Sequence, residues 1–280
     1  MKMNRTLVLA LAAAGLAVVI AGFAWAGPLR AGASILPIGS LVQRVGGAAV
    51  KVVVAVGPGR SPATYDPTPR LVAALARCRV FFAVGVPCEA RIVPRLKELA
   101  PGMEVVDLRE GLSLMRLEDG GVDPHVWLEP DMLAVMARRI CRVLARLEPE
   151  KASTFKANTE VVVRELNQLK AWIAQRLRPF RGRIMLVFHP SYGYFARAFG
   201  LRQVAIERHG KPPSARWLAK LKALAAREHI KAIFIQPQFP SAAATALARS
   251  LGMRLVELDP LPRDCIRGLR VIARRLAANL

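Results

Sequence analysis

PEKASTFKANTEVVVRELNQLKAWIAQRLR, residues Pro149–Arg178, is the stretch that decides the architecture of this 280-residue chain. It has no glycine and no internal proline, and this favours one uninterrupted helix. Pro149 suits the first helical position, and Pro179 is expected to end the helix. About thirty residues at a rise of 1.5 Å make a rod roughly 45 Å long. The apolar residues recur at spacings of three, four and seven, which is typical of one buried helix face: Phe155, Val162, Leu166, Leu169, Ile173 and Leu177.

Short apolar runs alternate with helical patterns on both sides of this long helix. The alternation predicts an α/β protein with parallel sheets and helical crossovers. The long helix would leave one lobe and enter the other. The expected strands are Val50–Val56, Val80–Val84, Glu104–Leu108, Ile184–Phe188, Gln203–Ile206, Ala232–Ile235 and Arg254–Leu258. The expected helices are Pro69–Arg77, Arg91–Leu99, Asp131–Leu147, Tyr194–Phe199, Ser214–Arg227, Ala242–Leu251 and Asp264–Leu276.

The first 26 residues have the pattern of a secretory signal peptide. Lys2 and Arg5 precede the apolar run 7–24, and 24–26 offers small residues at the two positions that signal peptidase reads. An uncleaved membrane anchor is the alternative. No cysteine lies near the cleavage point, so we expect no lipid anchor. We divide the chain into a signal peptide (1–26), a first α/β lobe (27–148), the linking helix (149–179) and a second α/β lobe (180–280).

The chain is strongly basic, with a formal net charge of +22. Such a charge suggests an anionic partner. The arginines are dispersed, however, and no nucleic-acid motif is present, so we expect a solvated basic surface and no nucleic-acid binding. Association with an anionic membrane surface stays open. The cysteines form no Cys-x-x-Cys pair, which argues against a thiolate zinc site and leaves disulfide pairing undetermined: Cys78, Cys88, Cys141 and Cys265.

Three candidate metal ligands lie where strands or loops end. His189 directly follows the strand 184–188, and Asp259 directly follows the strand 254–258. Ligands of parallel sheets bind beyond the carboxyl ends of strands. His125 lies in the loop before the helix 131–147. Two imidazoles and a carboxylate suit zinc, manganese or iron, although each residue alone also fits a structural role. We expect His209 and His229 to be structural or exposed.

Seven segments of the chain, in this order, resemble those of the periplasmic solute-binding proteins of zinc and manganese ABC importers, the ZnuA/TroA-like family. They are Ser61–Pro69, Gly85–Glu89, Asp123–Pro130, Phe188–Phe195, Gly210–Ser214, Ile235–Phe239 and Leu258–Leu261. The resemblance covers the chain from about Ser34 to its end. It implies two Rossmann-like lobes with parallel sheets, joined by one long backbone helix, with the metal between them. It also implies a monomer in the periplasm, with a membrane permease and a cytosolic ATPase as partners.

The resemblance also implies a ligand set from which this chain departs. His125, His189 and Asp259 match the second, third and fourth ligands of the family, but the first ligand, normally histidine, is here Ala63. The His-rich loop of many zinc-binding members is absent as well, because only residues 116–121 stand in its place. Three protein ligands leave an open fourth position. Water is one candidate to fill it, and three residues nearby in the sequence are others: Tyr65, Asp66 and Glu89.

Several functions are compatible with this altered site. The leading hypothesis is capture of Zn²⁺, with Mn²⁺ as the second cation, because histidine ligands favour zinc. A family member that has drifted from metal capture is the alternative, motivated by Ala63. A metallohydrolase would also use an open zinc position, but the chain has no His-Glu-x-x-His motif. We therefore expect a protein that is not an enzyme and has no catalytic residues. Nucleic-acid binding would rest on charge alone.

Overall fold

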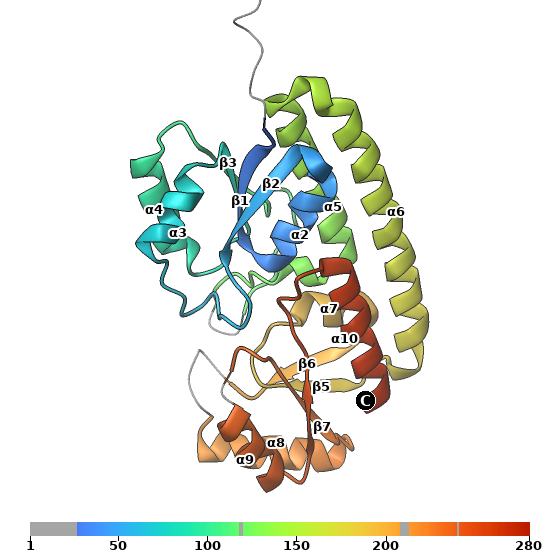
Figure 1. The fold of residues 1–280 in the computed structure, drawn as a ribbon. Helices are drawn as coiled ribbons and strands as arrows, with labels where there is room; N and C mark the ends of the chain where they lie inside the picture. The colour runs from blue at the N-terminus through green and yellow to red at the C-terminus, as the bar shows by residue number, and fades with distance from the viewer. Residues whose placement is uncertain (1–26, 118–119, 208–212, 240) are drawn as a thin grey trace, which may run out of the picture.

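The computed structural model describes residues 27–117, 120–207, 213–239 and 241–280. The predicted signal peptide and His209 lie outside these residues. Two lobes are stacked one above the other, and a long helix runs along one side of both (Figure 1). Within the described ranges, no helix combines the length and apolarity needed to cross a membrane.

The first lobe is a parallel four-stranded sheet with helices packed around it. Its strand order is β2-β1-β3-β4, and every pairing is parallel. All four residues of β3 are buried, as expected of a strand covered on both faces. The elements are β1 Leu29–Ile35, α2 Leu36–Gly46, β2 Val50–Val56, α3 Pro69–Ala76, β3 Val80–Ala83, α4 Glu89–Leu99, β4 Glu104–Asp107 and α5 Pro130–Leu147.

The second lobe repeats this arrangement. Its strand order is β6-β5-β7-β8, again with parallel pairing throughout. The α/β prediction is thereby confirmed for both lobes. The elements are β5 Ile184–Val187, α7 Gly193–Phe199, β6 Arg202–Ala205, α8 Ala215–Arg227, β7 Ala232–Ile235, α9 Ser241–Ser250, β8 Arg254–Glu257 and α10 Cys265–Asn279.

Helix α6, Ala152–Leu177, connects the two lobes. It has 26 residues, which makes it about 39 Å long. It is shorter than predicted because 3₁₀ turns replace the α-helix at 149–151 and 178–180. The six apolar residues of the predicted face are at most 2% exposed. This face packs against α2 and α5 of the first lobe and against α10 and α7 of the second (Figure 1).

The C-terminal helix α10 adds a second connection between the lobes. It packs against α6 and against α2 of the first lobe. On α6, the Trp172 ring lies under two guanidinium groups, 5.1 Å from that of Arg270 and 5.8 Å from that of Arg274. On α2, the Ser40 hydroxyl lies 3.9 Å from the Cys265 sulfur. These contacts hold the last helix against both lobes at once.

The sequence did not reveal β1 and α2. β1 is rich in small residues, which carry little strand propensity, yet it lies at the centre of the first sheet. Gly32 is needed there because a Cβ would lie 2.7 Å from the Phe81 side chain. At Gly32, therefore, the small residue serves close packing against Phe81 on the neighbouring strand β3.

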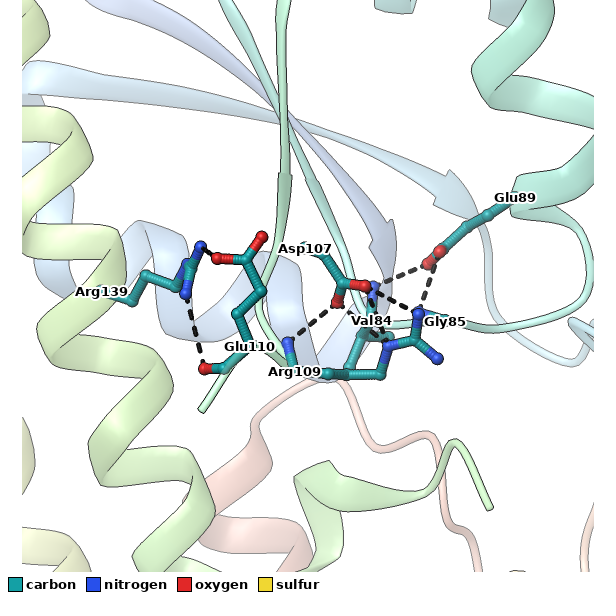
Figure 2. Close-up of polar contacts among 7 residues, drawn as sticks. All are labelled: Val84, Gly85, Glu89, Asp107, Arg109, Glu110 and Arg139. Carbon is teal, nitrogen blue, oxygen red and sulfur yellow. Dashed lines mark hydrogen bonds and ion pairs between the residues drawn. The ribbon is translucent and has the colours of Figure 1, made fainter. Parts of the chain in front are cut away.

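The loop that follows β3 is held by a buried carboxylate. Glu89 accepts hydrogen bonds from the Val84 N–H at 2.8 Å and from the Gly85 N–H at 2.9 Å (Figure 2). α4 begins at Glu89, two residues earlier than predicted. Gly85 has φ +79°, and a Cβ there would collide with the guanidinium of Arg109. That guanidinium is in turn bound by both carboxylate oxygens of Asp107. The backbone of this loop is thus fixed from two sides.

The packing of α6 predicts a large effect of a small substitution. Leu166 is fully buried, so Leu166→Ala should lower the free energy of unfolding by about 2–5 kcal/mol. Val161→Ala, at a position that is 43% exposed on the same helix, is the matched control. Urea unfolding followed by circular dichroism measures both. Equal losses for the two variants would contradict the interpretation of α6 as a one-faced core helix.

Because Glu89 is buried, we expect the free energy of unfolding to depend on pH. Burial raises the pKa of Glu89 in the folded protein, while its backbone hydrogen bonds oppose this. A raised folded pKa means that the carboxyl stabilises the fold at low pH and loses this contribution as pH rises through that pKa. The stability of the wild type relative to Glu89→Gln should therefore fall as pH rises above the ordinary range of a glutamate pKa.

The control for this experiment is Glu98→Gln, because Glu98 is exposed on the same helix. Urea unfolding at a series of pH values gives the free-energy difference for each variant. A difference for Glu89→Gln that is as independent of pH as the difference for Glu98→Gln would contradict the assignment.

Candidate metal centre

A cavity of about 210 Å³ lies between the two lobes. The segments that line it follow the carboxyl ends of strands in both sheets: Ser61, Pro62 and Ala63 after β2, Gly85, Val86 and Pro87 after β3, His189 after β5, and Gln236, Gln238 and Phe239 after β7. Loops of parallel sheets converge at this edge, in agreement with the prediction from the sequence.

The two predicted histidine ligands meet in this cavity from opposite lobes. His125 and His189 both line it, and their ring centroids are 5.8 Å apart with the planes at 71°. A tetrahedral zinc bound at about 2.0–2.1 Å by one nitrogen of each ring would place the centroids about 5 Å apart. The observed distance between the two ring centroids is therefore close to the distance expected if both rings bind the same metal ion.

Asp123 sets the orientation of His125. The carboxylate Oδ1 accepts a hydrogen bond from His125 Nδ1 at 2.6 Å and another from the His125 backbone N–H at 3.0 Å. The Asp123 side chain is 3% exposed. Because Nδ1 is held by the carboxylate, Nε2 is the ring nitrogen left for a ligand.

Glu207 holds His189 in the same manner. Its Oε2 lies 3.0 Å from His189 Nδ1. Gln236 fixes the backbone at this point, because its Nε2 donates to the His189 carbonyl at 2.8 Å. Sequence reasoning missed both orienting carboxylates. The available signals were the position of Asp123, two residues before a candidate ligand, and that of Glu207, just beyond the carboxyl end of β6.

Asp259, the third predicted ligand, is not among the described residues that line the cavity. Its Oδ1 accepts hydrogen bonds from Gln238 Nε2 at 2.8 Å and from the Leu261 N–H at 2.9 Å. Pro260 and Leu261 line the cavity. In the described part of the chain, no three His, Cys, Asp or Glu side chains are gathered so as to hold a metal ion. The structure thus brings together two of the three predicted ligands.

The structure places the three possible substitutes for the missing ligand outside the cavity lining. Arg91 donates to the Tyr65 carbonyl and lies 3.9 Å from the Asp66 carboxylate. Glu89 is bound to the backbone of its own loop. None of the three lines the cavity, as far as the described residues extend. Ala63 does line it and offers only a methyl group.

Neither His229 nor any of the four cysteines is among the residues that line the cavity. His229 is exposed at the end of α8 with φ +53°. All four cysteines are buried, and no disulfide joins any two of them in the structure. Burial raises the pKa of Cys88 to about 12, so its thiol stays protonated and is a poor metal ligand.

Hydrogen bonds between the lobes connect the loops that carry the site. Trp127 Nε1 donates to the Pro260 carbonyl at 2.7 Å. The Tyr194 hydroxyl donates to the Asp123 carbonyl at 2.9 Å and accepts from the Met115 N–H at 2.8 Å. The segment bearing His125 is therefore bound directly to the lobe that carries His189 and Asp259.

Comparisons with known proteins identify relatives of the chain. The family model of ZnuA, described as "Zinc-uptake complex component A periplasmic", matches residues 32–265. The zinc-binding lipoprotein AdcA of Streptococcus pneumoniae is 25% identical over 84% of this chain and 50% of its own length. The manganese-binding lipoprotein MntA of Halalkalibacterium halodurans is 27% identical over 60% of this chain and 57% of its own.

A solved structure agrees with this assignment. The crystal structure of ZnuA superposes with a TM-score of 0.86 at 32% sequence identity, covering 90% of this chain and 99% of that one. Together with the family model, which matches most of the sequence, this likeness shows that the chain belongs to the ZnuA family, the periplasmic A components of zinc-uptake complexes.

Proposed function

We propose that this chain captures a divalent transition metal outside the cytoplasm and delivers it to the permease of an ABC importer. Zinc is the preferred cargo and manganese the second. The observation that carries the proposal is the meeting of His125 and His189 across the cavity between the lobes. The names of the zinc-binding and manganese-binding relatives support the same two metals.

The orienting carboxylates support metal binding over a structural role for the histidines. Metal-binding histidines generally donate their second ring N–H to a carboxylate or carbonyl, which fixes the tautomer and raises the basicity of the ligating nitrogen. Asp123 and Glu207 provide this contact for His125 and His189, respectively. Both carboxylates are less than 12% exposed in their side chains, so their charges favour a cation nearby.

Asp259 is the proposed third ligand. One of its oxygens, Oδ1, is bound to Gln238 and Leu261, so its second oxygen, Oδ2, would be the donor to the metal. Three protein ligands of this kind are fewer than zinc takes in a closed site. The proposed site is therefore open on the side of Ala63.

Export, delivery and the division into lobes at 148 and 180 belong to the same proposal. The signal peptide pattern at 1–26 would bring the chain to the periplasm, and the family description names that compartment. A permease and a cytosolic ATPase would complete the importer. Transport is favoured over metal-dependent hydrolysis because the two carboxylates beside the histidines are bound to imidazole nitrogens, which leaves neither free as a general base.

Removal of either imidazole should strongly weaken zinc binding. Loss of a residue that orients a ligand typically weakens metal binding about 10–100-fold. His125→Ala and His189→Ala each remove a proposed ligand itself, so each should raise the dissociation constant for zinc by more than that. His229→Asn is the control, because His229 is exposed and asparagine tolerates its positive φ. Calorimetry on chelator-stripped protein that begins at residue 27 measures each affinity. Wild-type zinc affinity in both alanine variants would contradict the proposal.

Removal of an orienting carboxylate should have a smaller effect. Asp123→Asn and Glu207→Gln are expected to lower zinc affinity about 10–100-fold, because the imidazole tautomer and ring orientation are no longer fixed. Asp131→Asn, at an exposed position paired with Lys170, controls for loss of a negative charge. The readout is competition with a chromophoric zinc chelator. If Asp131→Asn and Asp123→Asn weaken binding equally, the carboxylates act only through net charge.

A further inference from the structure

Charge is segregated along the strands of the second lobe. Residues 180–280 contain five acidic side chains. Four of them lie at or beyond the carboxyl end of a strand, on the edge of the sheet whose loops line the cavity: Glu207, Glu257, Asp259 and Asp264. Only Glu228, between α8 and β7, lies at the opposite edge, where the strands begin. The amino-terminal edge of this sheet is therefore almost free of negative side chains.

That same edge carries a row of basic side chains. Each of the four strands begins with one of them or directly follows one, and in the order of the sheet they are Arg202, Arg183, Lys231 and Arg254. The Arg202 N–H donates to the Arg183 carbonyl at 3.0 Å, and the Arg254 N–H donates to the Lys231 carbonyl at 2.9 Å. Because neighbouring strands lie about 4.8 Å apart, the row is roughly 14 Å long.

Helices and turns that end at this edge add further basic side chains. Arg227 and Arg249 lie in the last turns of α8 and α9, and Arg178 and Arg181 lie between α6 and β5. Two basic residues of the edge have partners, because Arg227 pairs with Glu228 and Arg183 donates to the main-chain oxygen of Leu280 at 2.8 Å. The C-terminus thus lies at this edge, beside the end of α6 (Figure 1).

Six side chains remain that are exposed and form no ion pair with any residue that the structure describes. We call them the basic edge: Arg178, Arg181, Arg202, Lys231, Arg249 and Arg254. None of them lines the cavity between the lobes. Their charges add to one another without a nearby carboxylate to offset them, so this side of the lobe should attract an anionic surface.

We propose that the basic edge docks this protein onto a lipid surface with anionic headgroups. Each Lys or Arg close to such a surface strengthens binding about fivefold. Lipid headgroups move laterally, so they can gather around charges that are spread over a broad edge. Duplex nucleic acid is read by a helix or a two-stranded ribbon that lies in its groove, whereas this edge presents only the ends of strands and helices. A lipid surface therefore suits the edge better than nucleic acid.

The position of the basic edge leaves the metal site accessible. The edge lies at the amino ends of β5 to β8, and His189 follows the carboxyl end of β5. Docking through the edge would hold the protein at a membrane without covering the cavity. The inference goes beyond metal capture and does not depend on it, because no residue of the edge takes part in the proposed metal site.

Vesicle binding tests the proposal. The probes are vesicles of equal parts phosphatidylglycerol and phosphatidylcholine, with vesicles of phosphatidylcholine alone for comparison. The protein is the chain from residue 27, so that the apolar signal segment cannot itself insert. Co-sedimentation should show binding to the anionic vesicles alone, and the binding should weaken steeply as salt rises. The variant Arg202→Gln/Lys231→Gln/Arg254→Gln removes three charges, so its affinity should fall about a hundredfold.

A matched variant separates the edge from net charge. Arg70→Gln/Arg77→Gln/Lys97→Gln also removes two arginines and one lysine, all exposed at α3 and α4 of the first lobe. It should keep nearly the wild-type affinity for the anionic vesicles. Both triple variants should keep the wild-type circular dichroism spectrum and zinc affinity, which shows that fold and cavity are intact.

Three results would overturn the proposal. One is the absence of salt-sensitive binding to the anionic vesicles. Another is an equal loss of affinity in the two triple variants, which would mean that net charge alone acts. The third is tighter binding of the wild type to duplex DNA than to the vesicles, with the same loss in the edge variant, which would make the edge a nucleic-acid surface. Each of them would leave metal capture untouched, because zinc affinity is measured separately.

Discussion

Helix α6 buries one apolar face against helices of both lobes, and this packing is the constraint on which the site depends. The residues that meet at the cavity come from two separate sheets, so their distances depend on how the lobes are held. α10 and the hydrogen bonds from Trp127 and Tyr194 strengthen the same arrangement. A rigid helical connection permits small relative motions of the lobes and disfavours wide hinge closure. Capture would therefore depend on rearranged loops and side chains more than on large lobe movement.

The electrostatics of the site follow from this geometry. Each histidine has a buried or nearly buried carboxylate behind it, and each carboxylate belongs to the same lobe as its histidine. Each histidine is thus oriented by a residue of its own lobe, and the packing of the two lobes places the two histidines next to each other. The walls around them are mostly apolar, and an apolar environment strengthens the attraction between the carboxylates and a bound cation. Ala63 contributes only a methyl group to the apolar part of the cavity wall.

Much of the fold was predictable from the sequence because its signals are local. The α6 face, the buried strand β5 and the Ser214 cap of α8 all follow from patterns within a few residues. β1 was missed because its small residues carry little strand propensity, and Gly32 is explained only by close packing against Phe81 on the neighbouring strand, which is a long-range constraint. The histidines were found from their positions after strands and loops. Glu207 was missed because its partner His189 is 18 residues away, just beyond the neighbouring strand β5, and only the pairing of β5 with β6 brings the two together.

Anomalous diffraction at the zinc edge tests the central claim most directly. Crystals of the protein lacking residues 1–26, soaked in zinc, should show one strong peak between the lobes. We expect the peak about 2.0–2.1 Å from Nε2 of both His125 and His189. A peak at exposed His229 alone, or no ordered zinc in the cavity, would contradict the account.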